Sequence, residues 1–549
     1  MGIFGHIMKF IMIIIVAILV ILTLVCGAMF LFPSIQIFGY HYIKSGVNNG
    51  FYEKVSGETA KAQQAWDDAD IVRFEISGYN LSFDYATSEM LFDDHDIRVQ
   101  VSGQYRGFVK GSVDRPTYSS TNTTFNAEDA NPYNSYYKDP TRPDKKIYFI
   151  KMQEPEKGFM LRTQNSMTVT LTYDAFKNKD VEIIAKGGNV EFGTAGKMSA
   201  NNIRIESESG SVTFGETEIA TYEEAGIEKA GNIDITKSKK GKVVFNNDIK
   251  ANVNIEVNGG TDVVSLKNVL STGTSASKLS VKNHNGSVYV GNVFGDFSCD
   301  TKGAKMVVGD ITGTTRLVVK ETACQFGTIG VTPQVDTLSL EATGKTTITF
   351  DKVFSKIDMG KNTGTTITVK ESYGDVLYGV GTGKGTLNLK NVHASKINIV
   401  SSSGKINIDA KPEERVDIES TATAGTISFT GIKLGTVKIN KANEFSSCNI
   451  NGSFVEVHGD NIIKTTSGKV SISAPHSDNY SLAWESAKAS LDIFGNAKTT
   501  INTSKKYCES QGESFRCTTA FGQPCDEKYD YIDLLATTGT ITVSEYVAA

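Results

Sequence analysis

The sequence predicts an all-β protein: a β-solenoid of about 20-residue coils with an N-terminal β cap, preceded by one transmembrane helix. Three observations support this fold class. A long apolar segment lies near the start of the chain, and triplets of the form apolar-x-apolar recur through most of the rest. Six of the ten prolines precede residue 160, so the later residues are suited to regular sheet, in which proline lacks a donor.

The apolar segment covers residues 10–32, FIMIIIVAILVILTLVCGAMFLF, with no charged side chain. About 20 apolar residues cross a bilayer, and a cleaved secretory signal has a shorter apolar region. A lipoprotein signal at Cys26 is the alternative, but Val25 stands where that signal needs a small residue. We therefore expect a short tail (1–9), a transmembrane helix (10–32), and a juxtamembrane linker (33–70) with a short helix at 51–68.

The orientation of the helix in the membrane is predicted from indirect observations. Lys9 precedes the helix and Lys44 and Lys54 follow it, so the positive-inside rule does not discriminate. Long polar β domains with clustered cysteines are more often found outside the cytoplasm. We predict a single-pass cell membrane protein with its N-terminus inside and its body extracytoplasmic; the reverse orientation remains the alternative.

The repeat unit has two short strands joined by a turn, as in KINIVSSSGKINID (396–409) and KLSVKNHNGSVYV (278–290). Each apolar-x-apolar triplet fits a strand with one buried face, and Ser-Gly or Asn-Gly fits the turn. A single unit cannot bury its apolar face, whereas stacked units form a continuous core. The first apolar positions, most of them 18 to 21 residues apart, are Ile203, Ile233, Val253, Leu279, Phe297, Leu317, Leu338, Ile357, Val376, Ile397, Val416, Val437 and Val455.

This periodicity also predicts the boundaries and the core. In one coil Ile397, Ile399, Ile406 and Ile408 should point inward, with the intervening asparagines outward. The N-terminal β cap is expected at 71–180, with an insert at 112–146. The solenoid is expected at 181–545, with last coils at 481–495 and 531–543 on either side of a cysteine-bearing insert at 496–530.

The pattern resembles the DUF4097-type β-strand repeat proteins, an adhesin-like family of bacterial cell envelopes. The resemblance begins at FEISGYNLSF (74–83), continues through the acidic turn DDHD (93–96) and IRVQVSG (97–103), and resumes at VTLTYDAFKNKDVEIIAKGGNVEFG (169–193). It implies a bacterial envelope protein without an established catalytic motif. The inserts at 113–146 and near the C-terminus depart from the family pattern.

Three cysteines in the C-terminal insert, Cys508, Cys517 and Cys525, are spaced nine and eight residues apart, which is not the CxxC pairing of a zinc site. One disulfide within the insert is the functional interpretation, and three unpaired thiols are the alternative. The turn-like ESQGES segment favours Cys508–Cys517 over the wider Cys508–Cys525 closure. The remaining cysteines of the body, at inward positions, are expected to pack in the core: Cys299, Cys324 and Cys448. A bond between Cys299 and Cys324, which lie on consecutive coils, is the alternative.

The insert at 112–146 carries four tyrosines among polar residues: Tyr118, Tyr133, Tyr136 and Tyr137. Tyrosine with small polar neighbours is a frequent composition of contact surfaces, so this insert is a candidate contact loop. A mobile loop without a ligand is the alternative interpretation.

Catalytic and metal-binding motifs are not evident in the sequence. No histidine pair has ligand spacing, and the acidic run at 93–96 fits a solvated turn better than a Ca²⁺ site. GKGT (383–386) lacks the rest of a P-loop. We therefore expect no catalytic residues, no cofactor, no metal and no enzymatic activity, although some β-solenoids are carbohydrate-active enzymes.

The function predicted from these features is structural, adhesin-like or interaction-based at the cell envelope. The expected partners are the membrane, through the N-terminal helix, and envelope glycans or proteins. The net charge of −5 excludes a strongly basic nucleic-acid binder, so no nucleic-acid partner is expected. The alternatives are a self-assembling solenoid scaffold and a carbohydrate-active enzyme on a β-helix.

Overall fold

The structure is a computed structural model. It describes residues 2–32, 36–37, 40–47, 53–55, 68–85, 97–110, 117–120, 138–139, 141–153, 158–171, 175–193, 197–198, 200–215, 218–219, 221–224, 227–259, 262–271, 276–380, 384–401, 403–441, 446–476, 480–492, 499–510, 513–516, 518–525 and 527–547. The chain divides into two compact units, Met1–Asn247 and Asp248–Ala549, which are described separately.

Unit 1 begins with helix α1 (Gly2–Leu31), which ends two residues before Pro33. Residues His6–Leu31 are long and apolar enough to cross a membrane, with a mean hydropathy of 3.3, and none of the most apolar stretch is buried within the protein. Among its side chains, Phe10 is 66% exposed and Leu24 is 68% exposed. An isolated helix this apolar is stable only when lipid or another apolar partner covers it.

The strands of unit 1 alternate buried and exposed residues where the sequence alternates apolar and polar ones. They are β1 (Tyr40–Val47), β2 (Glu53–Val55), β3 (Ile71–Ser77), β4 (Asn80–Tyr85), β5 (Ile97–Lys110), β6 (Thr117–Ser120), β7 (Lys138–Asp139), β8 (Arg142–Gln153), β9 (Gly158–Leu171), β10 (Asp180–Lys186), β11 (Val190–Phe192), β12 (Lys197–Met198), β13 (Asn202–Ser207), β14 (Val212–Phe214), β15 (Glu218–Ile219), β16 (Thr221–Glu224), β17 (Ile227–Lys237) and β18 (Val243–Phe245).

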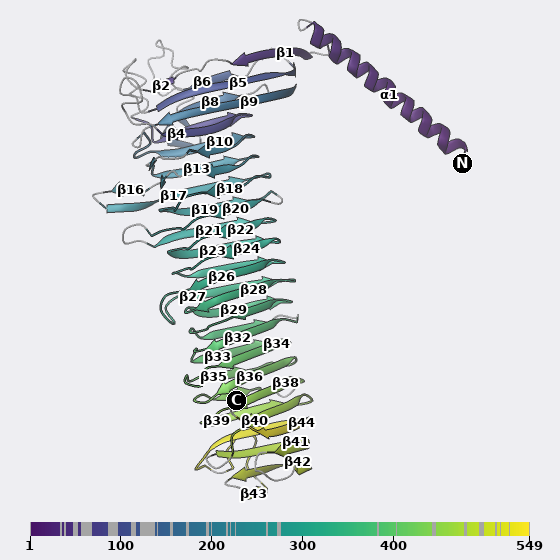
Figure 1. The fold of residues 1–549 in the computed structure, drawn as a ribbon, viewed down its shortest axis with the longest axis vertical. Helices are drawn as coiled ribbons and strands as arrows, with labels where there is room; N and C mark the ends of the chain where they lie inside the picture. The colour runs from purple at the N-terminus through teal and green to yellow at the C-terminus, as the bar shows by residue number, and fades with distance from the viewer. Residues whose placement is uncertain are drawn as a thin grey trace. The chain divides into compact units, whose positions relative to one another are not determined.

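The coils of unit 1 stack as parallel strand pairs, but not in chain order (Figure 1). β3 pairs with β8 on one side and with β10 on the other, and β4 pairs likewise with β9 and β11. The stack continues through β13 and β14 to β17 and β18. The layer of β3 and β4 therefore lies between the layer of β8 and β9 and that of β10 and β11, although β3 and β4 come first of these strands in the chain. The parallel stacking thus already includes residues that the sequence analysis assigned to the N-terminal cap.

Antiparallel pairing distinguishes the N-terminal cap from the coils. β5 pairs antiparallel with β9, and β1 and β2 both pair antiparallel with β5. The prediction of a short helix at 51–68 is wrong at 53–55, because these residues form strand β2 on the edge of this sheet. Edge pairing supplies the backbone hydrogen bonds that a short isolated helix could not maintain.

Unit 2 contains the remaining strands. They are β19 (Ala251–Val257), β20 (Val263–Leu266), β21 (Ser277–Asn283), β22 (Ser287–Val290), β23 (Gly295–Lys302), β24 (Lys305–Val308), β25 (Thr315–Lys320), β26 (Ala323–Ile329), β27 (Thr337–Thr343), β28 (Thr347–Val353), β29 (Lys356–Thr363), β30 (Thr366–Val369), β31 (Val376–Val380), β32 (Thr386–Val392), β33 (Lys396–Ser401), β34 (Lys405–Ala410), β35 (Asp417–Ser420), β36 (Thr426–Ile432), β37 (Val437–Ile439), β38 (Asn449–Phe454), β39 (Asp460–Thr465), β40 (Lys469–Ala474), β41 (Tyr480–Asp492), β42 (Thr499–Ser510), β43 (Glu513–Arg516) and β44 (Asp530–Glu545).

In unit 2 each strand pairs in parallel with the strand two positions later, from β19–β21 to β38–β40, so each coil lies on the preceding one (Figure 1). The predicted inward residues Ile397, Ile399, Ile406 and Ile408 are all buried. The β-solenoid prediction is thus confirmed, as is the long apolar helix before it, which is the one candidate membrane span among the described residues.

Side chains at one corner of the coils hydrogen-bond to the backbone of the next coil. The Asn268 side-chain oxygen accepts a hydrogen bond from the Asn292 backbone N–H at 2.8 Å. The Asn292 side chain accepts one from the Asp310 N–H at 2.9 Å, and the Asp310 carboxylate accepts one from the Thr328 N–H at 2.6 Å. This repetition satisfies backbone donors that a turn would otherwise leave unpaired.

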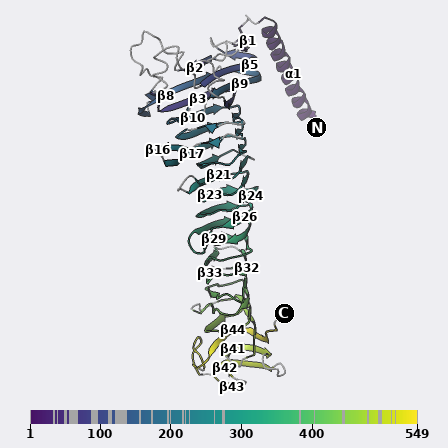
Figure 2. The same ribbon diagram turned by 60° about the vertical axis from the view of Figure 1, so that its left-hand side comes forward.

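The last coils of unit 2 also depart from chain order. β44 pairs in parallel with β39 and β40 on one side and with β41 on the other, so the final strand lies between two earlier segments. Beyond β41, β42 pairs antiparallel with it, and β43 pairs antiparallel with β42. Both views place β44 beside β41 (Figures 1 and 2). The sequence analysis identified both last coils but not their exchanged order.

Candidate functional site

A surface pocket of about 310 Å³ lies in unit 1, over the outward face of β3, β10 and β13. Its charged residues occupy one row across the stacked strands, because Arg73 pairs in register with Glu182, and Glu182 with Arg204. Each of these residues is the middle of an apolar-x-apolar triplet, which turns it away from the core. The alternating pattern therefore places an opposite charge on each neighbouring coil.

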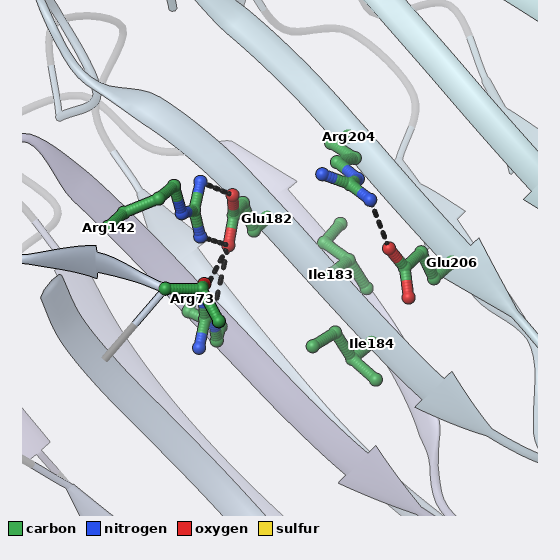
Figure 3. Close-up of a pocket in the computed structure, with 8 residues that line it drawn as sticks. Arg73, Arg142, Glu182, Ile183, Ile184, Arg204 and Glu206 are labelled. Atoms are coloured by element: carbon green, nitrogen blue, oxygen red, sulfur yellow. Dashed lines mark hydrogen bonds and ion pairs between the residues drawn. The ribbon is translucent and has the colours of Figure 1, made fainter. Parts of the chain in front are cut away.

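Glu182 interacts with two arginines of this pocket, Arg142 and Arg73 (Figure 3). Arg142, at the start of β8, binds both of its oxygens, with Nη1–Oε1 at 2.7 Å and Nη2–Oε2 at 3.1 Å. Arg73 binds Oε2 through Nε and Nη2, both at 2.9 Å. This bidentate geometry is the strong form of an arginine–carboxylate pair.

The electrostatic environment of Glu182 keeps it ionised. Its side chain is only 8% exposed, and this burial alone would raise its pKa. The hydrogen bond from Arg142 and the charge of Arg73 outweigh burial, so the pKa of Glu182 lies below its ordinary value. A carboxylate held in this state is a poor proton donor at neutral pH.

The second carboxylate of the pocket, Glu206, pairs with Arg204 on the same strand at 2.7 Å. Both side chains are largely exposed, at 46% and 59%. The pocket thus presents three arginines and two carboxylates beside the apolar Ile183 and Ile184. This set can bind a polar or anionic group, and it has no nucleophilic side chain other than the Thr141 hydroxyl.

Sequence reasoning missed this pocket. The signal was present in the middle residues of consecutive triplets, VRF (72–74), VEI (181–183), IRI (203–205) and IDI (233–235), where the charge alternates. This alternation of charge is recognised only when β3 is aligned with β10. The two strands are neighbours in the stack, but about 100 residues of chain separate them.

A second ordered surface feature lies in unit 2. The rings of Phe354, Tyr373 and His393 stack on successive coils, with centroids 4.6 Å and 4.4 Å apart. All three side chains are partly exposed. Lys352 lies over Tyr373 at 5.3 Å and pairs with Glu371 at 2.7 Å. Because the ring faces cover one another, this ladder offers ring edges rather than open faces to a partner.

The predicted cysteine site is only partly described by the structure. Cys525 is disulfide-bonded, whereas Cys26, Cys299, Cys324 and Cys448 are free. Cys517 and the side chain of Cys508 lie outside the described part of the chain. A bond of Cys525 to either of them is incompatible with the Cys508–Cys517 pairing that the turn favoured, since that pairing would occupy both thiols.

The other predicted residues are distributed as follows. Cys299, Cys324 and Cys448 are buried, and burial raises the pKa of Cys324 to about 12 and that of Cys448 to about 11. Tyr118 belongs to β6, where its backbone pairs with Met152. The other contact-loop tyrosines, Tyr133, Tyr136 and Tyr137, and the acidic run at 93–96 lie outside the described residues. Within the described ranges, no cluster of three or more His, Cys, Asp or Glu side chains could hold a metal ion.

Comparison with known proteins gives one family match. Residues 378–517 match the sequence model of the family described as Toastrack DUF4097. No curated protein and no solved structure matches the chain. The matched residues run from β31 to the segment after β43, so the family pattern covers parallel coils and part of the C-terminal end of unit 2. Residues 378–517 are therefore similar to the family described as Toastrack DUF4097.

Proposed function

We propose that this protein is a membrane-anchored, extracytoplasmic β-solenoid with a structural or adhesin-like interaction role at the cell envelope. The exposed apolar helix α1 is the observation that carries the proposal. A helix with such side chains needs a lipid environment, and the strands β1–β44 all follow it in the chain. The family resemblance and the disulfide at Cys525 favour the outer side of the membrane.

The interaction role is supported by the regularity of the coil surfaces. Cross-coil hydrogen bonds such as that from Asn292 to Asn268 fix the corner side chains in a repeating row. The charged pocket around Glu182 and the aromatic ladder around Tyr373 are both built from side chains of successive strands. Such preorganised rows bind a partner without a large cost of ordering. Envelope glycans or proteins, rather than nucleic acid, remain the proposed partners.

The alternative functions receive less support from the geometry. A glycosidase site in the Glu182 pocket would need a carboxylic acid whose pKa is raised, whereas the pKa of Glu182 is lowered. End-to-end assembly needs a free strand edge, and in the described part of unit 2 the outer edge of β41 is covered by the antiparallel strand β42.

Membrane orientation can be tested by labelling Val400→Cys with a membrane-impermeant maleimide. Val400 is 52% exposed, and Ile399→Cys is the matched control because Ile399 is fully buried. In intact cells with any outer barrier permeabilised, peptide mapping should find label at position 400 and not at 399. Labelling of position 400 only after lysis of the cell membrane would place the body in the cytoplasm and contradict the proposal.

A further inference from the structure

A buried lysine and a buried aspartate are in direct contact at the C-terminal end of unit 2. Lys506 lies on β42 and Asp533 on β44, two strands that flank β41 in the sheet. The distance from Lys506 Nζ to Asp533 Oδ2 is 2.9 Å, and the two side chains are 5% and 0% exposed. Removing both charges from water is costly, so this pair is not explained by stability alone.

We propose that Lys506 and Asp533 condense to an intramolecular amide bond that covalently links β42 to β44. The amine nitrogen and the carboxyl group are already in van der Waals contact within the folded protein. Such proximity replaces a collision in solution by a reaction between fixed neighbours, which lowers the barrier to bond formation. Exclusion of water disfavours the reverse reaction, hydrolysis of the amide.

The reaction balances without any other reagent. One proton passes from the Lys506 ammonium to the Asp533 carboxylate, which gives a neutral amine and a carboxylic acid. The Nζ–Cγ bond then forms, one Cγ–O bond breaks, and a second proton from nitrogen leaves with that oxygen as water. The burial of Asp533 supports the first step, because it raises the pKa of this carboxyl despite the neighbouring lysine.

The surroundings of Asp533 are suited to this reaction. The Gly522 backbone N–H donates a hydrogen bond to Oδ2 at 2.7 Å, which can stabilise negative charge on this oxygen as nitrogen adds. The second carboxyl oxygen, Oδ1, is buried and has no hydrogen-bond partner among the residues that the structure describes. An unpaired buried oxygen raises the free energy of the carboxylate, and formation of the amide with loss of one oxygen would remove this cost.

Glu485 is the neighbouring group that can carry the proton. It lies on β41, next to Trp484, which pairs with Tyr507 on β42 and with Leu534 on β44. Because β41 lies between β42 and β44, the charges of both Asp533 and Lys506 act on Glu485. Burial and the charge of Asp533 raise its pKa against the opposing charge of Lys506, and we assign to this carboxyl the transfer of a proton from nitrogen to the leaving oxygen. It is unchanged at the end of the reaction.

Further hydrogen bonds of Lys506 stabilise the unreacted state, in which Lys506 and Asp533 form only a salt bridge. Lys506 Nζ also donates to the Ala520 carbonyl at 3.1 Å, the Gln523 carbonyl at 3.0 Å and the Thr519 hydroxyl at 3.2 Å. These three acceptors hold Nζ beside Asp533. The amide product keeps one N–H, which one of these oxygens can accept.

Mass spectrometry of the full-length reduced protein, purified in detergent, tests the bond directly. The intact mass should be lower than the sequence mass by one water molecule, and a protease digest should yield a branched peptide that contains Lys506 and Asp533. Trypsin should fail to cleave after Lys506 in the denatured protein. A full sequence mass with free Lys506, even after prolonged incubation at neutral pH, would show a salt bridge only and overturn the proposal.

Variants separate the roles of the three residues. Lys506→Arg keeps the positive charge but not the primary amine, so it should retain the full sequence mass. Asp533→Asn should give the same branched product with loss of ammonia instead of water. Glu485→Gln should lower the rate of bond formation at least tenfold, with partial recovery in Glu485→Asp; an unchanged rate in Glu485→Gln would exclude the proton-transfer role.

Discussion

The ring of Phe192 lies flat on that of Phe214, with centroids 4.4 Å apart and an angle of 4° between the planes. Phe83 continues this stack on one side and Phe245 on the other, at 4.7 Å and 4.2 Å. The four phenylalanines come from successive layers of unit 1, and the parallel in-register pairing of β4, β11, β14 and β18 places them above one another. This buried column connects four coils through one kind of contact.

Removal of one ring should therefore destabilise several coils of unit 1. We expect Phe214→Ala to lower the free energy of unfolding by about 3 to 5 kcal/mol, through lost transfer energy and the resulting cavity. Hydrogen exchange of the β11, β14 and β18 amides would measure this effect. Tyr85→Ala is the control, because Tyr85 is 38% exposed and its loss should change exchange little. Equal effects of the two variants would show that the column does not stabilise unit 1.

Inward and outward side chains alternate along the strands of unit 2, so substitutions at two neighbouring positions can be compared. Ile399→Asp would bury an unpaired carboxylate, and we expect a loss of at least about 3 kcal/mol. Val400→Asp places the same charge on the 52% exposed neighbouring position and should be almost neutral. Urea denaturation of the two variants is the measurement. If Ile399→Asp unfolds at the same urea concentration as the unsubstituted protein, position 399 does not face the core.

The side chains that face the core could be predicted from the sequence, because side chains alternate between the two faces of a strand and this alternation is visible in neighbouring residues. Of the first apolar positions, Leu317 and Val416 are both buried although the register is shifted by two residues, with Thr315 beside Phe297 and Ile418 beside Ile397. A shift of two residues keeps the same face. Val455 is the exception: it is only partly buried, because the next strand begins at Asp460.

The order of layers could not be predicted, since it depends on pairing between residues far apart in sequence. Nothing local in residues 530–545 distinguishes a strand that follows β41 from one that lies between β40 and β41. The contact of Lys506 with Asp533 depends on this inserted strand, and the pocket around Glu182 depends on the equivalent exchange at β3. Both candidate sites therefore lie where the chain departs from simple stacking.

Two glycines near β23 distinguish a steric requirement for glycine from a conformational one: Gly295 is the first residue of the strand, and Gly303 follows its last residue. A Cβ atom at Gly295 would lie 1.9 Å from the Ser277 carbonyl oxygen, so Gly295→Ala must displace the neighbouring backbone. We expect a loss of about 3 kcal/mol from this overpacking. Gly303 has a φ of +74° but no atom within 4 Å of the added methyl group, so Gly303→Ala should cost only about 1 kcal/mol. Thermal denaturation should reproduce this order; the reverse order would contradict the close coil contact at Gly295.

The ionised state of Glu182 predicts a defined pH dependence in unit 1. Because its folded pKa is lower than the ordinary value of 4.5, its ion pairs contribute fully above that value and are lost as pH falls through the folded pKa. Glu182→Gln leaves Arg73 and Arg142 without the carboxylate, and we expect a loss of about 2 kcal/mol at pH near 7. This value is below the range typical of buried pairs, since Arg142 is 35% exposed.

The pH profile distinguishes this ion pair from a loss of packing. The difference between the unsubstituted protein and Glu182→Gln, measured by hydrogen exchange of the β3 and β10 amides, should be constant at neutral pH and shrink as the carboxyl is protonated. Glu206→Gln is the matched control: Glu206 and Arg204 are largely exposed, and solvent screens exposed pairs, so little change is expected at any pH. A Glu182→Gln deficit that persists unchanged well below the folded pKa would assign the effect to packing, because by then both proteins carry a neutral side chain at position 182.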